Sequence, residues 1–143
     1  MRVIKFRAWD KEANIMVYSD HRTRKLYDVY YGFEMNEKGE LECHWEGEWN
    51  ESHSLDGGSL DNLMQYTGLK DKNGVKIYEG DIIRNPTFDG GYLINEVVED
   101  RGTFAMKDIE DLPYVQNPLY EWISDCEVIG NIHEDKELLE VKK

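Results

Sequence analysis

The stretch Leu63–Arg84, LMQYTGLKDKNGVKIYEGDIIR, restricts the fold of this chain more than any other segment, because turn residues recur in it at short intervals. The pair Asn73-Gly74 predicts a tight turn, since both residue types tolerate a positive φ angle. Asp71 can accept hydrogen bonds from the backbone that follows it and so help to close that turn. We therefore predict a hairpin turn over 72–75, with Asn73 and Gly74 at or near positive φ.

Apolar residues flank this turn and form the two arms of a hairpin. Leu69 precedes the turn, and the run Val75–Tyr78 follows it. Gly80 then lets the chain change direction, and Asp81–Arg84 is predicted to be the next strand. The stretch is thus predicted to be β-structure whose turns are encoded locally, and it contains no catalytic motif.

Alternation of apolar and polar residues, together with β-prone composition, extends this interpretation to the rest of the chain. The predicted strands are 2–9, 15–18, 26–35, 41–45, 92–99, 103–107 and 127–132. Gly130, inside the last of them, is typical of a bulge or a tight bend. Residues 19–25 are predicted to form a loop, and 135–141 a short terminal helix.

Short strands, tight turns and little helix predict a mainly β fold. The strand order from residue 78 onward suits a small SH3-like β-barrel in the C-terminal half, with an additional N-terminal β-hairpin region. We expect residues 1–143 to form a single compact unit, with an N-terminal β-strand region over 1–62 and the barrel region over 63–143. Glycines and polar residues predict an acidic flexible loop at 46–59.

The chain has 143 residues and a formal net charge of −13 at pH 7. Residues 1–33 carry seven Lys or Arg against four Asp or Glu (+3), residues 34–62 one against nine (−8), and residues 63–143 nine against seventeen (−8). Binding to a nucleic-acid backbone needs clustered Lys and Arg, so this charge argues against a nucleic-acid partner. We interpret the acidity as a solubility feature, with a basic partner or nucleic-acid mimicry as alternatives.

A small basic cluster, Arg22, Arg24 and Lys25, lies in the loop predicted for 19–25. We interpret it as solvated surface, and contact with an anion is the alternative. The sequence assigns it no role.

Two cysteines, Cys43 and Cys126, are too few for a disulfide scaffold in a chain of this length. The first residues, MRVIKFRAWD, lack the apolar core of a signal peptide, and no run approaches the roughly 18 apolar residues of a transmembrane helix. We therefore expect a soluble, cytoplasmic protein with reduced thiols and no membrane partner.

The histidines do not have the spacing of a metal or catalytic site. His44 directly follows Cys43 on a predicted strand, so the two side chains point to opposite faces. His21, His53 and His133 are isolated in the sequence. We therefore expect no catalytic residue, no cofactor and no metal site.

Three segments resemble the YopX family of phage and prophage proteins: IKFRAWDKEANIM near the start, QYTGLKDKNGVKIYEGDII in the middle and EVIGNIHEDKELL at the end. The resemblance implies an origin in a bacteriophage or an integrated prophage, and a β-rich fold. The cytoplasm expected above is then that of the bacterial host. It carries no assigned biochemical activity, so no catalytic residue is transferred. His133 stands where Tyr is common in the family, and Asp135-Lys136 replaces a frequent Asn-Pro.

We expect a small protein-interaction module that contacts a host or phage protein. The aromatic residues Trp9, Tyr66 and Tyr78, with Asp81, form the candidate partner surface. A nucleic-acid-associated accessory protein and an enzyme with a site assembled from scattered residues are the alternatives. Self-association into a homo-oligomer stays open.

Overall fold

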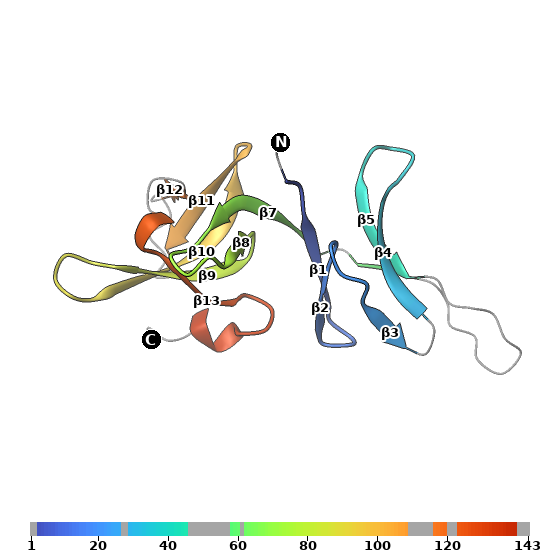
Figure 1. Cartoon of the computed structure of the whole chain (residues 1–143), viewed down its shortest axis with the longest axis horizontal. Coiled ribbons are helices and arrows are strands. Elements are labelled where there is room, and N and C mark those ends of the chain that lie inside the picture. Colours follow the sequence, from blue (N-terminus) through green and yellow to red (C-terminus); the bar gives the residue numbers. More distant parts are fainter. Residues whose placement is uncertain are drawn as a thin grey trace, which may run out of the picture. The chain divides into compact units, whose positions relative to one another are not determined.

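A computed structural model of the chain describes residues 3–26, 29–45, 58–60, 62–108, 116–119 and 123–139 (Figure 1). These residues form antiparallel strands joined mostly by tight turns, with two short 3-10 helices. The predicted mainly β fold with little helix is confirmed. The strands are β1 (Phe6–Asp10), β2 (Ile15–Tyr18), β3 (Arg24–Leu26), β4 (Val29–Met35), β5 (Leu41–Trp45), β6 (Gly58–Leu60), β7 (Leu63–Lys70), β8 (Lys76–Tyr78), β9 (Asp81–Pro86), β10 (Tyr92–Asp100), β11 (Thr103–Asp108), β12 (Gln116–Pro118) and β13 (Glu127–Asn131), and the 3-10 helices are η1 (Ile123–Asp125) and η2 (Lys136–Leu139).

The chain divides into two compact units. The N-terminal unit is Lys5–Gln65, and the C-terminal unit is Tyr66–Lys143 together with Met1–Ile4. Strand β7 begins in the N-terminal unit and ends in the C-terminal unit.

Two groups of strands build the N-terminal unit. Strand β1 pairs with β2 and with the first residues of β7, and the second group has the order β3-β4-β5-β6. Ala8 and Val17 from the first group pack with Tyr31 and Cys43 from the second. The two groups therefore share one buried core, as expected for strands that turn alternate residues inward.

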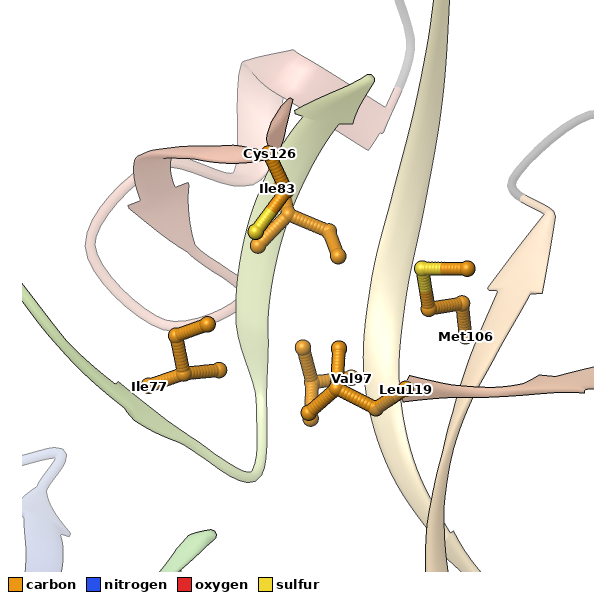
Figure 2. Packing of buried hydrophobic residues seen from close by; sticks show 6 residues of the cluster. All are labelled: Ile77, Ile83, Val97, Met106, Leu119 and Cys126. Atoms are coloured by element: carbon orange, nitrogen blue, oxygen red, sulfur yellow. The ribbon is translucent and has the colours of Figure 1, made fainter. Parts of the chain in front are cut away.

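The C-terminal unit contains the hairpin of β7 and β8 and a five-stranded sheet with the order β12-β11-β10-β9-β13. Its core consists of residues that are almost fully buried, shown in Figure 2: Ile77, Ile83, Val97, Met106, Leu119 and Cys126. These strands and η1 are compatible with the SH3-like barrel, which stays a prediction.

Strand β13 contains the predicted bulge. Its register against β9 shifts between Val128 and Gly130. A Cβ atom at Gly130 would lie 2.6 Å from Oδ2 of Asp135 and 2.8 Å from Cδ1 of Leu138. A larger residue at this position would therefore have to displace the side chains of Asp135 and Leu138, in the segment that leads into η2 and in η2 itself.

Several predicted boundaries in the N-terminal half are wrong. The first strand begins at Phe6 instead of residue 2, and the loop predicted for 19–25 ends early because Arg24–Leu26 forms β3. Of the flexible loop predicted for 46–59, residues 46–57 lie outside the described residues, and Gly58–Leu60 is strand β6, paired with β5. Glycine and serine have low β-propensity, so the sequence did not predict this short strand, whose stability comes from pairing with a neighbour.

The predicted terminal helix over 135–141 is also wrong in type and extent. The described part is the 3-10 helix η2, Lys136–Leu139, and residues 140–141 lie outside the described residues. Leu138 is half-buried and Leu139 is exposed, so little packing supports this segment, and an α-helix of a single turn would gain few backbone hydrogen bonds.

Candidate functional site

The turn between β7 and β8 confirms the predicted hairpin and corrects one detail of it. The N–H of Gly74 donates to the carbonyl of Asp71 over 3.0 Å, and the N–H of Asp71 donates to the carbonyl of Val75 over 2.8 Å. Gly74 has a φ angle of 80°, whereas Asn73 is not among the residues with positive φ. The predicted positive φ at Asn73 is therefore wrong, because the three-residue loop needs the left-handed conformation only at its last position.

The carboxylate of Asp71 holds this turn from the side, as predicted. Its Oδ1 accepts hydrogen bonds from the backbone N–H groups of Asn73 and Val75, each over 2.9 Å. Its Oδ2 accepts from the N–H of Val128 in β13, also over 2.9 Å. Asp71 is buried, so one carboxylate joins the signature turn to the last strand of the C-terminal unit.

Asp81 has a comparable backbone role. Its Oδ2 accepts a hydrogen bond from the N–H of Tyr78 over 2.8 Å, across the bend at Gly80. Gly80 has a φ angle of 82° and donates its N–H to the carbonyl of Val97 over 2.8 Å. The polar residues of the YopX-like middle segment therefore stabilise tight backbone turns.

The structure brings together three of the four residues predicted for a partner surface. Tyr66 and Tyr78 are opposite each other in the β7–β8 pair, with ring centroids 5.4 Å apart, and Asp81 holds the following bend. Trp9 lies on β1 in the N-terminal unit. All four are buried, exposing 7% or less of their surface. Their partner role stays a prediction, and it requires the partner to reach these side chains.

The N-terminal unit contains a charged cluster that sequence analysis missed, and we name it the Asp10 cluster. Lys25 Nζ donates to Asp10 Oδ2 over 2.6 Å, and the hydroxyl of Tyr31 donates to the same oxygen. Lys25 Nζ also lies 3.8 Å from the ring centroid of Trp45, a cation–π contact. The remaining oxygen of Asp10 accepts from the backbone N–H groups of Glu12 and Ala13.

These contacts set the protonation states in the cluster. Burial alone would raise the pKa of Asp10, but the hydrogen bonds from Lys25, Tyr31 and Ala13 together lower it. Burial, and then the hydrogen bond to Asp10, raise the pKa of Tyr31 far above its ordinary value. The Asp10 carboxylate is therefore ionised and the phenol of Tyr31 neutral, and with Lys25 these side chains form an arrangement suited to holding β1, β3 and β4 together.

The predicted basic cluster is solvated surface in part. Arg22 and Arg24 are exposed, and the guanidinium of Arg22 stacks 3.8 Å from the ring centroid of Tyr30. The prediction is wrong for Lys25, which is half-buried in strand β3 and paired with Asp10. The sequence offered one signal for this outcome, namely the position of Asp10 directly after Trp9, the last residue of the predicted strand 2–9, where a buried carboxylate would need a partner.

The most exposed large apolar side chain among the described residues is Phe88, at the tip of the β9–β10 hairpin. Its relative exposure is 110%, and Tyr92 and Leu93 at the start of β10 are also exposed. The tip of this hairpin stands apart from the other strands of its sheet (Figure 1). We name Phe88, Asp89, Tyr92 and Leu93, which are all exposed, the hairpin tip. A phenylalanine inside the polar, glycine-rich run PTFDGG was the sequence signal for it.

Local hydrogen bonds fix the backbone under Phe88. The N–H of Thr87 donates to the carbonyl of Gly91 over 2.8 Å, and the N–H of Gly90 donates to the carbonyl of Thr87 over 3.2 Å. The carboxylate of Asp89 accepts from the Thr87 hydroxyl and from the N–H of Gly91. These two hydrogen bonds, that of Thr87 first, lower the pKa of Asp89.

Other chemistry of the described residues is limited. Cys43 and Cys126 are free and buried, and burial is the main reason why the pKa of each thiol is raised to about 11. Within the described ranges, no group of three or more His, Cys, Asp or Glu side chains could hold a metal ion. No helix formed by these residues is long and apolar enough to cross a membrane.

Comparison with known proteins supports the three-segment resemblance. The family model described as YopX protein matches residues 5–140. The crystal structure of protein EF1440 from Enterococcus faecalis is similar at 28% sequence identity, covering 97% of this chain and 99% of that chain with a TM-score of 0.51. The crystal structure of protein yopX from Bacillus subtilis is similar at 20% identity, covering 96% of this chain and 98% of that chain with a TM-score of 0.61. The comparison with curated proteins gave no match.

The family match and the structural similarities extend over nearly the whole chain. At 20% identity, the similarity to the Bacillus subtilis protein shows the fold alone. The matched residues include Asp71, Gly80 and Asp81, whose backbone contacts shape the middle segment. The chain belongs to the YopX family.

Proposed function

We propose that this protein is a small protein-interaction module that acts for a phage or prophage in the cytoplasm of its bacterial host, where it contacts a host or phage protein. Membership of the YopX family supports a small β-rich protein. The phage role rests on the resemblance of the three sequence segments, and the cytoplasmic location on the targeting argument from the sequence.

One observation carries the interaction role, the complete exposure of Phe88 on a fixed turn. Large apolar side chains are unfavourable in water, and a rigid aromatic residue is a common anchor of protein interfaces. The backbone under Phe88 is already ordered, so binding through it costs little conformational entropy.

The polar residues of the middle segment bind the protein's own backbone, which is consistent with placing the partner contact at the hairpin tip. Asp71 and Asp81 use their carboxylates to accept backbone N–H groups, and Thr67 donates its hydroxyl to the carbonyl of Ile77 over 2.8 Å. These residues build a stable support, while the hairpin tip offers a surface for contact. We therefore assign partner contact to the tip and stability to the family segment.

Site-specific photo-crosslinking tests this proposal. A photoreactive phenylalanine replaces Phe88 in one variant and Val75 in the control. Val75 is exposed and lies next to another turn of the same unit. Both variants are expressed in the bacterium that carries the gene, irradiated, and their adducts are identified by mass spectrometry. A protein cross-linked through position 88 is then purified, and its binding to the wild type and to Phe88→Ser and Val75→Ser is measured by calorimetry.

We expect Phe88→Ser to weaken binding at least about tenfold, as an anchor residue would, and Val75→Ser to leave it within about twofold. Equal binding by the wild type and Phe88→Ser would refute the proposed contact. So would adducts that form as readily from position 75 as from position 88.

A further inference from the structure

We infer that the hairpin tip inserts into an apolar pocket of a protein partner, and that Lys or Arg side chains line the rim of this pocket beside Asp89. This inference rests on the proposed function and specifies the chemistry of the partner. It follows from three features of the tip, namely its shape, its charge and the fixed position of that charge.

The shape of the tip favours a pocket over a flat surface. Phe88 is at the apex, between the ends of two paired strands, and its relative exposure is 110%. Pro86 and Tyr92 face each other across the pair just below it. A protruding ring on a narrow support buries most of its area only when a partner surrounds it, so a concave apolar site is the complementary surface.

The hairpin tip carries one charged side chain, the carboxylate of Asp89. The run from Asn85 to Asn95, NPTFDGGYLIN, contains one residue that is charged at neutral pH, and this residue is Asp89. The nearest cation along the strand is Arg84, whose Nη2 lies 2.7 Å from Oε2 of Glu127 and whose guanidinium lies 4.6 Å from the ring centroid of Tyr92. The tip therefore presents an aromatic ring next to a negative charge that is not balanced within the loop.

The position of that charge is fixed by the turn. Thr87 and Gly91 donate hydrogen bonds to the Asp89 carboxylate, which hold it beside Phe88 in its ionised form. A partner that buries the ring has to place something next to this carboxylate. A Lys or Arg at the pocket rim avoids the cost of leaving the charge without a partner and steers the two proteins together.

A membrane surface fits the tip less well. Anionic lipid headgroups would repel both Asp89 and a chain with a net charge of −13. A neutral bilayer would receive one phenyl ring, with no basic residue in the tip to bind phosphate groups. The same charge argument disfavours a second copy of this acidic chain as the occupant.

The test uses the purified protein that cross-links through position 88. Its affinity is measured for the wild type, Phe88→Ser, Asp89→Asn and the control Val75→Ser, at ionic strengths of about 0.05 M and about 0.5 M. Asparagine keeps an oxygen that accepts from Thr87 and Gly91, so Asp89→Asn removes the charge and leaves the turn. Backbone NMR shifts of residues 85–95 check that the turn is retained.

We expect Asp89→Asn to weaken binding about fivefold to tenfold at the lower ionic strength and much less at the higher one, because salt screens a charge at the rim. The loss caused by Phe88→Ser should persist at both. If Phe88→Ser weakens binding and Asp89→Asn does not, the basic rim is refuted while the interaction module stands. If Phe88→Ser has no effect, both proposals fail.

Two further outcomes also overturn the inference. The first is an adduct at position 88 with a second copy of this chain. The second is cosedimentation of the wild type, but not of Phe88→Ser, with phosphatidylcholine vesicles or with vesicles containing phosphatidylglycerol. Either result would place a different occupant on the tip.

Discussion

Val128 donates its backbone N–H to Oδ2 of Asp71 over 2.9 Å, across 57 positions of sequence. The other oxygen of the same carboxylate accepts two N–H groups of its own turn. Lys72 adds a backbone hydrogen bond to the carbonyl of Cys126 over 3.1 Å. One buried side chain thus makes the most conspicuous turn of the sequence part of the tertiary structure.

The first prediction concerns this carboxylate. Asp71→Ala should lower the free energy of unfolding of the C-terminal unit by about 2–4 kcal/mol, since three N–H groups lose a charged acceptor. Asn36→Ala is the matched control, because Asn36 Oδ1 accepts the N–H groups of Lys38 and Glu40 in a turn of the same form. The control should cost its own unit about 1 kcal/mol. Urea denaturation measures both, and unchanged amide exchange at Val128 in Asp71→Ala would contradict the assigned role.

The second prediction separates backbone strain from crowding. No atom lies within 4 Å of a Cβ built on Gly74, whose φ angle is 80°. Gly74→Val should therefore cost roughly 1–3 kcal/mol through strain alone, and Gly74→Asn less, because Asn tolerates this conformation. Gly130→Ala should also destabilise the unit, by contact with Asp135 and Leu138. Thermal denaturation compares the three variants, and equal stability of Gly74→Val and the wild type would show that the turn rearranges.

The third prediction concerns the Asp10 cluster. Lys25→Met leaves the buried Asp10 carboxylate without its cation and should cost about 3–5 kcal/mol. Adding Asp10→Asn to Lys25→Met should recover part of that loss, because the uncompensated charge is removed. A double-mutant cycle by urea denaturation gives the coupling, and strictly additive effects would mean that the pair contributes nothing.

The fourth prediction follows from the lowered pKa of Asp10. A carboxyl group whose pKa is lower in the folded state contributes stability above its unfolded pKa, which is 3.8 for Asp10. That contribution is lost as the pH falls from about 4 through the lower folded value. The wild type should therefore lose stability more steeply below pH 4 than Asp10→Asn. Denaturation series at closely spaced pH values measure the two slopes, and parallel curves would contradict the pKa direction.

The fifth prediction concerns the thiols. Cys43 and Cys126 are buried and their pKa values are raised to about 11, so the native protein should react slowly with a thiol reagent at pH 8. Denaturation without reductant should release two reactive thiols, since both cysteines are free. A rapid reaction of the native protein would mean that the cores open frequently, and a count of zero after denaturation would mean a disulfide.

Local chemistry explains which parts of the fold could be predicted. The turn at Gly74 depends on short-range backbone preferences, and the sequence identified it. The sequence also identified the bulge at Gly130, where the residues that pack against the glycine, Asp135 and Leu138, follow closely in the chain. Strand β3 depends on pairing with β4 and on the contact of Lys25 with Asp10, and the short polar β6 depends on pairing with β5. Such long-range pairings leave little trace in a local pattern.

The candidate site was harder to predict for a related reason. The partner surface was predicted from the aromatic residues Tyr66, Tyr78 and Trp9, which are buried in the structure. Phe88 is a single apolar residue in a loop, so it contributes nothing to a periodic pattern, and only the geometry of the hairpin gives it exposure. The sequence shows which residues are apolar, but the tertiary structure determines which of them are exposed to solvent.

The carboxylates along β13 have a consequence for colloidal behaviour. This strand is the outermost on its side of the five-stranded sheet, where free N–H groups could recruit a strand from another molecule. Two of these groups are already occupied, that of Val128 by Asp71 and that of Asn131 by Asp135. An incoming strand would have to displace both carboxylates from these N–H groups and then lie next to their negative charges. We therefore expect this edge of the sheet to resist the addition of strands from other molecules, even in concentrated solution.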